Sequence, residues 1–430
     1  MISYTIKANG KTVKGGKMSV NVEPQGSKEI TIATSGLKSK PGTEYFIYFN
    51  VTTTEPEPLI PVGHEIAYEQ FRLPIEPGER TFATGGPALK VSAEGNELTA
   101  SSSKVNFVFD KKTGLVSSYK VGGTEYFKDG FGLQPNFWRA PNDNDYGNGN
   151  PKRLQVWKQS SKNFNVVDAN IVMDGKDAVL TANYLLAAGN LYIVTYRISP
   201  SGVVKADFTF TSTDMEAAKT EASEATLMAT FTPGSDAARK AASKLEVPRI
   251  GVRFRLPAEM NQVEYFGRGP EENYIDRNAG TLIDLYKTTA DQMYFPYVRP
   301  QENGHHTDTR WLTLNKKGGK GLTIYADKTI GFNALRNSVE DFDGEETVSR
   351  PYQWLNRDAG ELVHDESKAK DQLPRKTHIN DITPRNFVEV CVDMKQQGVA
   401  GYNSWGARPE PGYNIPANQE YKWGFTIVPR

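Results

Sequence analysis

The sequence predicts an all-β protein, and two observations lead to that prediction. Apolar and polar residues alternate with a period of two in many segments, most clearly in Val252-Arg253-Phe254-Arg255-Leu256. Such alternation is typical of half-buried antiparallel strands. Gly and Pro pairs punctuate these segments as turn residues do, for example at Pro41-Gly42 and Gly122-Gly123. Repeated short strands joined by such turns favour β-sandwiches.

Composition narrows the class of protein further. The 430 residues carry 51 Lys and Arg against 51 Asp and Glu, so the formal net charge is zero. Nucleic acids and anionic membranes attract basic surfaces, and we therefore expect neither as a partner. The single cysteine, Cys391, excludes an intramolecular disulfide framework and a cysteine-based zinc site. No run approaches the ~18 apolar residues that a membrane span needs, and polar residues follow Met1, so no secretion signal is expected.

The first block of strands is predicted over residues 1–84. Tyr45, Ile47 and Phe49 share one face of a predicted strand, and about four to six strands fit in the block. We interpret it as a partial immunoglobulin-like β-sandwich. The best boundary is Thr84-Gly85-Gly86-Pro87, where glycine and proline interrupt the pattern.

The second block, residues 88–430, has a continuous β pattern. Alternation is clear over 105–109, 191–198 and 204–210. The block exceeds one ordinary sandwich, so two sandwiches or one very large one are predicted. Two regions depart from the pattern. Residues 213–246 are rich in Ala, Glu and Lys, and we interpret them as a long excursion between strands. Residues 337–372 are dense in charge, and we interpret them as an extended loop or a pair of polar edge strands.

Four segments combine Arg, amides, carboxylates and aromatic residues in a way that strands do not require: 136–147, 265–274, 299–308 and 403–409. In one interpretation, Arg–carboxylate pairs fix long loops onto the sheets, because buried charges need partners. In the other, the segments form a carbohydrate surface, where aromatic faces stack on sugar C–H groups and polar side chains bind hydroxyls. Trp405, between Ser404 and Gly406 in a loop, is the best candidate for such a stacking residue.

A metal site is not predicted. His305, His306 and Asp308 offer too few ligands at suitable spacing, and adjacent histidines point apart on a strand. The acidic segments 341–345 and 143–145 lack the full oxygen-ligand pattern of a calcium loop. The sequence has no phosphate-binding loop, nucleophile elbow or dinucleotide fingerprint.

The four segments closely resemble the C-terminal part of the large bacterial β-galactosidases of glycoside hydrolase family 2. Matching strings run over Trp138–Gly147, Gly267–Arg277, Tyr294–Gly304 and Asn403–Pro409, in the family's order and spacing from about residue 88 onward. A weaker resemblance to the preceding immunoglobulin-like domain covers residues 22–73. The resemblance implies that 88–430 form a galactose-mutarotase-like β-supersandwich, whose loops close the sugar pocket of a catalytic barrel.

The resemblance also implies what the chain lacks. In the family, a (β/α)₈ barrel carries both catalytic glutamates, and nothing here resembles its motifs. A retaining glycosidase needs two carboxylates about 5–5.5 Å apart, and no residue of this chain is assigned as either. We therefore expect a fragment of a β-galactosidase that begins inside the immunoglobulin-like domain and is inactive alone.

The resemblance assigns expected roles to individual residues. Trp405 would be an aromatic platform in the sugar pocket. The segment 142–148 would be a mobile loop beside it, with Gly147 as its hinge. The remaining predicted substrate-binding residues are Asn142, Asp143, Asn144 and Asp145, and the predicted loop-fixing residues are Arg139, Arg268, Glu271, Asn273, Arg299, Glu302 and Arg408.

Partners follow from the same resemblance. We expect a β-galactoside in the complete enzyme, the catalytic barrel domain, and a further copy of the chain as a homo-oligomer. No cofactor is expected in this chain, whereas Mg and Na are implied for the complete enzyme. Its location would be cytoplasmic or periplasmic. The alternative is a stand-alone aldose 1-epimerase-like protein or carbohydrate-binding module, which would use His305 or His306 with Glu302 as acid and base.

Overall fold

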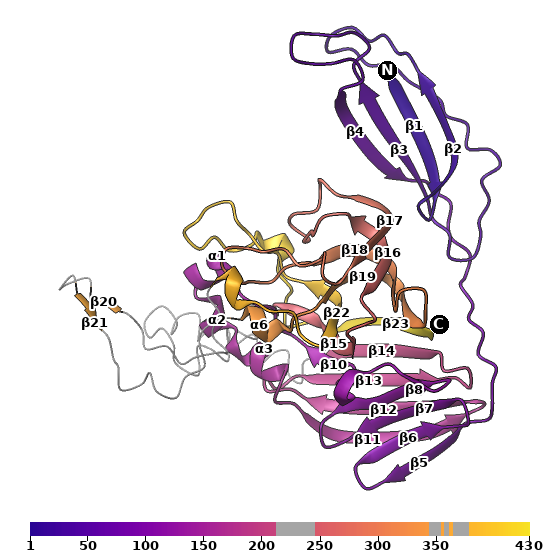
Figure 1. Ribbon diagram of the computed structural model, residues 1–430, viewed down its shortest axis with the longest axis vertical. Helices are drawn as coiled ribbons and strands as arrows, with labels where there is room; N and C mark the ends of the chain where they lie inside the picture. The colour runs from indigo at the N-terminus through magenta and orange to yellow at the C-terminus, as the bar shows by residue number, and fades with distance from the viewer. Residues whose placement is uncertain (212–245, 344–353, 357–360, 364–377) are drawn as a thin grey trace.

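The computed structural model describes residues 1–211, 246–343, 354–356, 361–363 and 378–430. Strands dominate it, so the all-β prediction is confirmed. Figure 1 shows a small N-terminal sheet at one end and a larger body of packed sheets that holds most of the other described strands. No helix in the described residues is long and apolar enough to cross a membrane.

The N-terminal sheet is antiparallel, in the order β2-β1-β3-β4. Its strands are β1 (Ile2–Ala8), β2 (Lys11–Met18), β3 (Tyr45–Thr52) and β4 (Glu65–Arg72). Ile6, Tyr45 and Ile47 form a small core under the loops on one face, as the alternation predicts. These four strands form one sheet, and residues 1–84 form no second sheet.

Polar contacts fix this sheet against β17 (Leu282–Thr289) and β18 (His306–Asn315) of the larger body. Glu44 pairs with Arg310, at 2.6 Å between Oε2 and Nε. The Gln70 amide accepts from the backbone N–H of Ile283 at 2.9 Å and donates to its carbonyl at 2.8 Å. Gln70 thereby pairs with the backbone of Ile283 on the free edge of β17, which among the described strands pairs with β16 alone.

The larger body consists of a five-stranded sheet facing a twelve-stranded sheet. Aromatic residues join the two, for example Phe107 with Tyr196 and Phe109 with Tyr184, whose ring centroids lie 5.6 and 6.4 Å apart. The five-stranded sheet holds β5 (Lys90–Glu94), β6 (Glu97–Ser101), β7 (Val105–Asp110), β8 (Leu115–Val121) and β9 (Thr124–Glu125). The other strands of the twelve-stranded sheet are β10 (Gln134–Asn136), β11 (Asn165–Asp174), β12 (Asp177–Leu185), β13 (Leu191–Ile198), β14 (Val204–Thr211), β15 (Arg249–Pro257), β16 (Gln262–Gly269), β19 (Gly321–Leu335), β22 (Phe387–Gln396) and β23 (Tyr421–Pro429).

Short helices lie at one end of this sheet. The segment 142–148, predicted as a loop, instead contains helix α1 (Asp143–Gly147). That part of the prediction was wrong because Asn142 and Asp145 cap the helix reciprocally, each side chain accepting from the other's backbone N–H. The other helical segments are α2 (Asn150–Arg153), α3 (Gln155–Ser160), α6 (Val339–Phe342), η1 (Lys128–Gly130), η3 (Ile379–Asp381) and η4 (Pro411–Tyr413).

The two atypical regions lie mostly outside the described residues. The predicted excursion at 213–246 does so except for Glu246. Within 337–372, the described parts are residues 337–343, which include α6, and a two-stranded pair, β20 (Trp354–Asn356) with β21 (Glu361–Val363).

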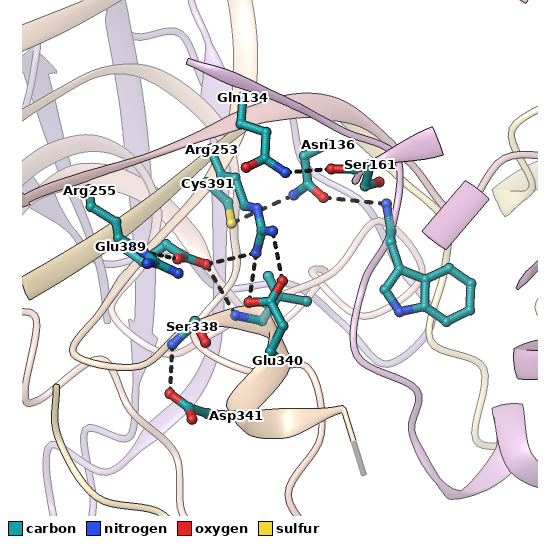
Figure 2. A network of polar contacts seen from close by, with 12 residues as sticks. Gln134, Asn136, Ser161, Arg253, Arg255, Ser338, Glu340, Asp341, Glu389 and Cys391 are labelled. Carbon is teal, nitrogen blue, oxygen red and sulfur yellow. Dashed lines mark hydrogen bonds and ion pairs between the residues drawn. The ribbon is translucent and has the colours of Figure 1, made fainter. Parts of the chain in front are cut away.

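A buried polar network seats α6 on the sheet (Figure 2). Arg253, 4% exposed on β15, binds Glu340 of α6 at 2.7 Å and Glu389 of β22 at 3.2 Å. Burial favours the neutral form of Glu340, but the guanidinium outweighs it and lowers the pKa of that carboxyl. Glu389 also accepts from the Val339 N–H at the start of α6. The network therefore neutralises the charges that attach α6 to the sheet.

Candidate functional site

The four predicted segments converge on a cavity of about 520 Å³. Each of them supplies lining residues, from α1, from the turn after β16, from the segment before β18 and from the loop after β22. Its lining residues are Arg139, Asn142, Asp143, Asn144, Tyr274, Arg277, Tyr297, Gln301, Glu302, Val399, Ala400, Gly401, Asn403 and Ser404. Its volume lies within the range of small-molecule sites, about 300–1,000 Å³.

Arg139 forms the buried base of one wall. It is 2% exposed and faces Asp145, with Nη1–Oδ2 at 2.8 Å and Nη2–Oδ1 at 3.1 Å. Asn150 donates to the same Asp145 carboxylate at 2.8 Å. Asp145 therefore fixes the cavity wall from beneath, since it is absent from the lining and only 2% exposed.

Glu302 connects the cavity to a deeper charge cluster. Its carboxylate pairs with Arg249, which is fully buried and also donates to Gln396 at 2.6 Å. Arg249 Nε lies 3.2 Å from Asp393 Oδ2. Burial raises the pKa of Asp393 to about 7, with Arg249 opposing the rise and Glu302 adding to it.

Arg299, a predicted loop-fixing residue, pairs with Asp143, a predicted substrate-binding residue that lines the cavity. Arg299 binds Asp143 at 3.0 Å, and its guanidinium lies 3.7 Å from the ring centroid of Tyr146. Both carboxylates of the lining, Asp143 and Glu302, are thus in ion pairs. Neither is presented as an unpaired acid or nucleophile.

Trp405 follows directly on the lining residue Ser404 but is not itself a lining residue. Its side chain is 90% exposed, as a platform residue would need to be, and its backbone N–H donates to Asn403 Oδ1 at 2.9 Å. Gly147 packs directly against the same loop: a Cβ at position 147 would lie 2.7 Å from Gly406 Cα. A close approach of two backbones thus accounts for Gly147 at the end of α1.

Other predicted loop-fixing residues lie farther from the cavity. Arg408 pairs with the buried Glu246 at 2.6 Å and ties down the end of the Trp405 loop. Asn273 is fully buried and uses both amide protons and its carbonyl oxygen, donating to the carbonyls of Arg268 and Glu271 and accepting from Thr307.

Arg268 lies in a different place. It pairs with Asp308 at 2.6 Å and lines a separate cavity beneath the N-terminal sheet. The structure therefore does not bring Arg268 to the site.

Glu271 does not fix a loop through its side chain, which is exposed and has no hydrogen bond or ion pair within the described chain. Its neighbour Glu272 does so instead. The Glu272 carboxylate accepts from Gly304 N–H at 2.7 Å, Arg277 at 2.8 Å and the Tyr274 hydroxyl at 3.3 Å. The prediction chose the wrong glutamate of the pair.

Sequence reasoning also missed lining residues that lay inside or beside the recognised strings. Tyr274, Arg277, Tyr297 and Gln301 belong to this set. Tyr402, three residues before Trp405, is 69% exposed and forms a second aromatic residue on the same loop. The position of these residues within or beside the family-matching segments could have identified them, whereas their composition alone could not.

The histidines cannot act on a ligand in the cavity. His305 is 2% exposed and stacks on Tyr274, and burial, with Arg249 adding to it, lowers its pKa well below the usual value. His306 is 3% exposed, with its ring nitrogens 3.0 and 3.1 Å from the carbonyls of Gly304 and Pro270. An epimerase that used them as acid and base is therefore not supported.

The described part of the chain also holds no cluster of three or more His, Cys, Asp or Glu side chains suited to a metal. The acidic residues that suggested calcium are in ion pairs instead: Asp145 with Arg139, Asp341 with Arg385 and Asp343 with Lys158.

Comparison with known families gives two matches. A family model described as beta galactosidase small chain matches residues 101–427, and one described as beta-galactosidase, domain 4, matches residues 1–74. Both agree with the resemblance that the four segments indicate.

Curated relatives match along almost the whole chain. A β-galactosidase of Priestia megaterium is 29% identical over 429 residues, and one of Halalkalibacterium halodurans is 24% identical over 432 residues. Each alignment covers 99% of this chain but 36% of the relative. The chain thus spans about a third of the length of these proteins.

Solved structures align over about four fifths of the chain with low sequence identity. A galactose mutarotase related enzyme from Lactobacillus acidophilus aligns over 78% of this chain and 97% of its own, with 10% identity and a TM-score of 0.38. A galactose 1-epimerase from the same species aligns over 80% and 98%, with 6% identity and a TM-score of 0.36.

Proposed function

The chain belongs to the β-galactosidase small-chain family, and from this premise we propose that it is the C-terminal part of a β-galactosidase. In that enzyme it would supply part of the sugar site, while a catalytic barrel would supply the acid and the nucleophile. The observation that carries the proposal is the cavity built by all four segments, with the exposed Trp405 next in sequence to its lining residue Ser404.

The chemistry of the rim suits a sugar. The Asn144, Gln301 and Ser404 side chains line the cavity and make no hydrogen bond within the described residues. Amides and hydroxyls of this kind bind sugar hydroxyls, and an exposed indole can stack on the C–H face of the ring. The lining carboxylates are neutralised by Arg299 and Arg249, which favours an uncharged ligand.

The division of labour follows from the same geometry. Retaining hydrolysis needs two carboxylates about 5–5.5 Å apart, one of them protonated. The two carboxylates of this cavity are both engaged by guanidinium groups, Asp143 by Arg299 and Glu302 by Arg249. We therefore assign binding and shaping of the site to this chain, and bond cleavage to the barrel.

Complementation tests this function. The chain alone should not hydrolyse aryl β-galactosides, whereas mixing it with the remaining two thirds of the Priestia megaterium relative should restore turnover. In the restored enzyme, Trp405→Ala should raise KM by on the order of tenfold to a hundredfold, the loss expected for about 1–3 kcal/mol of aromatic stacking.

A matched control separates a specific loss from a general one. Phe71→Ala removes another exposed aromatic side chain, on β4 and far from the cavity in sequence, and should leave KM unchanged. Hydrolysis by the chain alone that disappears on mutation of Asp143 or Glu302 would contradict the proposed division of labour.

A further inference from the structure

The loop that carries Trp405 begins in an unusual backbone conformation. Ala400 has a φ of +58°, and Gly401 follows at +113°. Residues with a Cβ rarely adopt positive φ, because the side chain crowds the following carbonyl. Something outside the loop must therefore hold Ala400 in place.

Asp276 supplies that contact. Its Oδ1 accepts from the backbone N–H of Val399 at 3.0 Å, and its Oδ2 accepts from the N–H of Ala400 at 2.8 Å. Two successive N–H groups that converge on one anion form a small anion-binding concavity. Gly398 lies so close that a Cβ there would be 2.5 Å from Asp276 Oδ2.

The support beneath Asp276 is rigid. Tyr274 and Arg277 exchange two backbone hydrogen bonds, of 3.2 and 2.8 Å, across the turn that contains Asp276. The preceding Asn273 is fully buried, and its side chain is saturated with hydrogen bonds. The backbone that carries Asp276 is thus fixed independently of the loop.

The carbonyl side of the same short segment is also held. Asn142 Nδ2 donates to the Val399 carbonyl at 2.9 Å, and Arg139 Nη2 donates to the Gly398 carbonyl at 3.3 Å. Residues 398–400 are therefore fixed by side chains of two other segments, whereas Tyr402 and Trp405 beyond them are exposed.

We propose that Asp276 is a positioning residue: its carboxylate clamps the 399–400 backbone and thereby sets the position of Trp405 relative to the cavity. The inference deepens the proposed function, in which Trp405 meets the sugar. It also gives a role to the Asp276 carboxylate, which neither lines the cavity nor takes part in the ion pairs of Asp143, Asp145 and Glu302.

Fluorine NMR of the chain labelled with 5-fluorotryptophan tests the clamp, with the Trp405 resonance assigned from Trp405→Phe. Asp276→Asn places an amide N–H₂ against one of the two backbone donors, so it should shift or broaden the Trp405 resonance and leave those of the buried Trp138 and Trp157 unchanged. Asp174→Asn, which alters an exposed carboxylate paired with Arg197, is the matched control and should change none of them.

A second variant reaches the same contact from the other side. Gly398→Ala keeps Asp276 but displaces its carboxylate, and should change the Trp405 resonance in the same way. Ala400→Gly, added to Asp276→Asn, should move the resonance back toward its wild-type position because glycine tolerates positive φ.

An unchanged Trp405 resonance in folded Asp276→Asn or Gly398→Ala would overturn the proposal. None of these measurements needs the catalytic barrel. Failure of complementation would therefore count against the proposed function alone.

Discussion

Replacement of Asp393 by asparagine should make the protein more stable at neutral pH and leave it unchanged at acid pH. Asp393 is fully buried on β22, and neither of its oxygens accepts a hydrogen bond within the described residues. Arg249 is the cation nearest to it, but Arg249 is shared with Glu302. The neighbouring His305 and Cys391 do not help, since burial lowers the pKa of the first and raises that of the second, so both stay neutral.

The size and sign of the effect follow from the pKa. Burial raises the pKa of Asp393 from an ordinary 3.8 to about 7. The folded state therefore holds the proton more tightly than the unfolded chain does, and the resulting stability is fully present below pH 4 and lost as the pH rises to 7. At 1.36 kcal/mol per pKa unit, the loss is about 4 kcal/mol.

Asparagine mimics the protonated carboxyl and cannot ionise. The free energy of unfolding of Asp393→Asn should therefore match that of the wild type near pH 4 and exceed it by up to about 4 kcal/mol at pH 8. Urea unfolding, followed by the fluorescence of the buried tryptophans between pH 4 and 8, measures the difference. Other carboxylates titrate in both proteins and cancel.

Asp174→Asn is the control, because that side chain is 62% exposed; its difference from the wild type should not vary with pH in this range. A difference between Asp393→Asn and wild type that stays constant from pH 4 to 8, or that falls with pH, would refute the reasoning.

Four further substitutions test the packing of the larger body. Trp405→Ala should change the free energy of unfolding by no more than about 0.5 kcal/mol. Trp157→Ala empties a fully buried position and should lower that free energy by roughly 3–5 kcal/mol. Thermal denaturation separates the two effects, and a large loss of stability in Trp405→Ala would show that Trp405 is a packing residue. Gly147→Ala should cost roughly 1–3 kcal/mol through overpacking against Gly406, and an unchanged melting temperature would show that α1 and the Trp405 loop do not touch. Arg253→Met should cost roughly 3–5 kcal/mol in urea unfolding, because it leaves two glutamates without their buried cation; stability equal to wild type would contradict the network.

The strands could be predicted because the alternation of apolar and polar residues in the local sequence marks the buried face of each strand. Val204, Ala206, Phe208 and Phe210 alternate with polar residues in the sequence, and all four are buried on β14. The pairing of the strands was not predictable. In the structure β14 pairs with β23, where Val204 lies opposite Ile427, and no local pattern encodes a contact between residues so far apart.

The local sequence contained a signal for helix α1, but the turn-forming composition of the segment outweighed it. Asn142 and Asp145 have the spacing of a capping box, which marks a helix start. The dense Asn, Asp and Gly composition of 142–149 favours turns, and the helix has only five residues. In so short an element, contacts such as Asp145 with Arg139 decide the conformation.

The motifs located the site, but they did not determine the role of each charged residue within it. Glu271 and Glu272 are adjacent and chemically identical, yet only Glu272 meets Gly304 and Arg277, because the turn directs one side chain inward and the other outward. Asp143 meets Arg299, a residue 156 positions away, and Glu302 meets Arg249, which lies in no recognised segment. The Glu302–Arg249 pair is buried, and buried pairs add little net stability, because desolvation offsets their attraction. Such ion pairs instead favour one arrangement of the distant segments over the alternatives, and a preformed cavity needs a single arrangement.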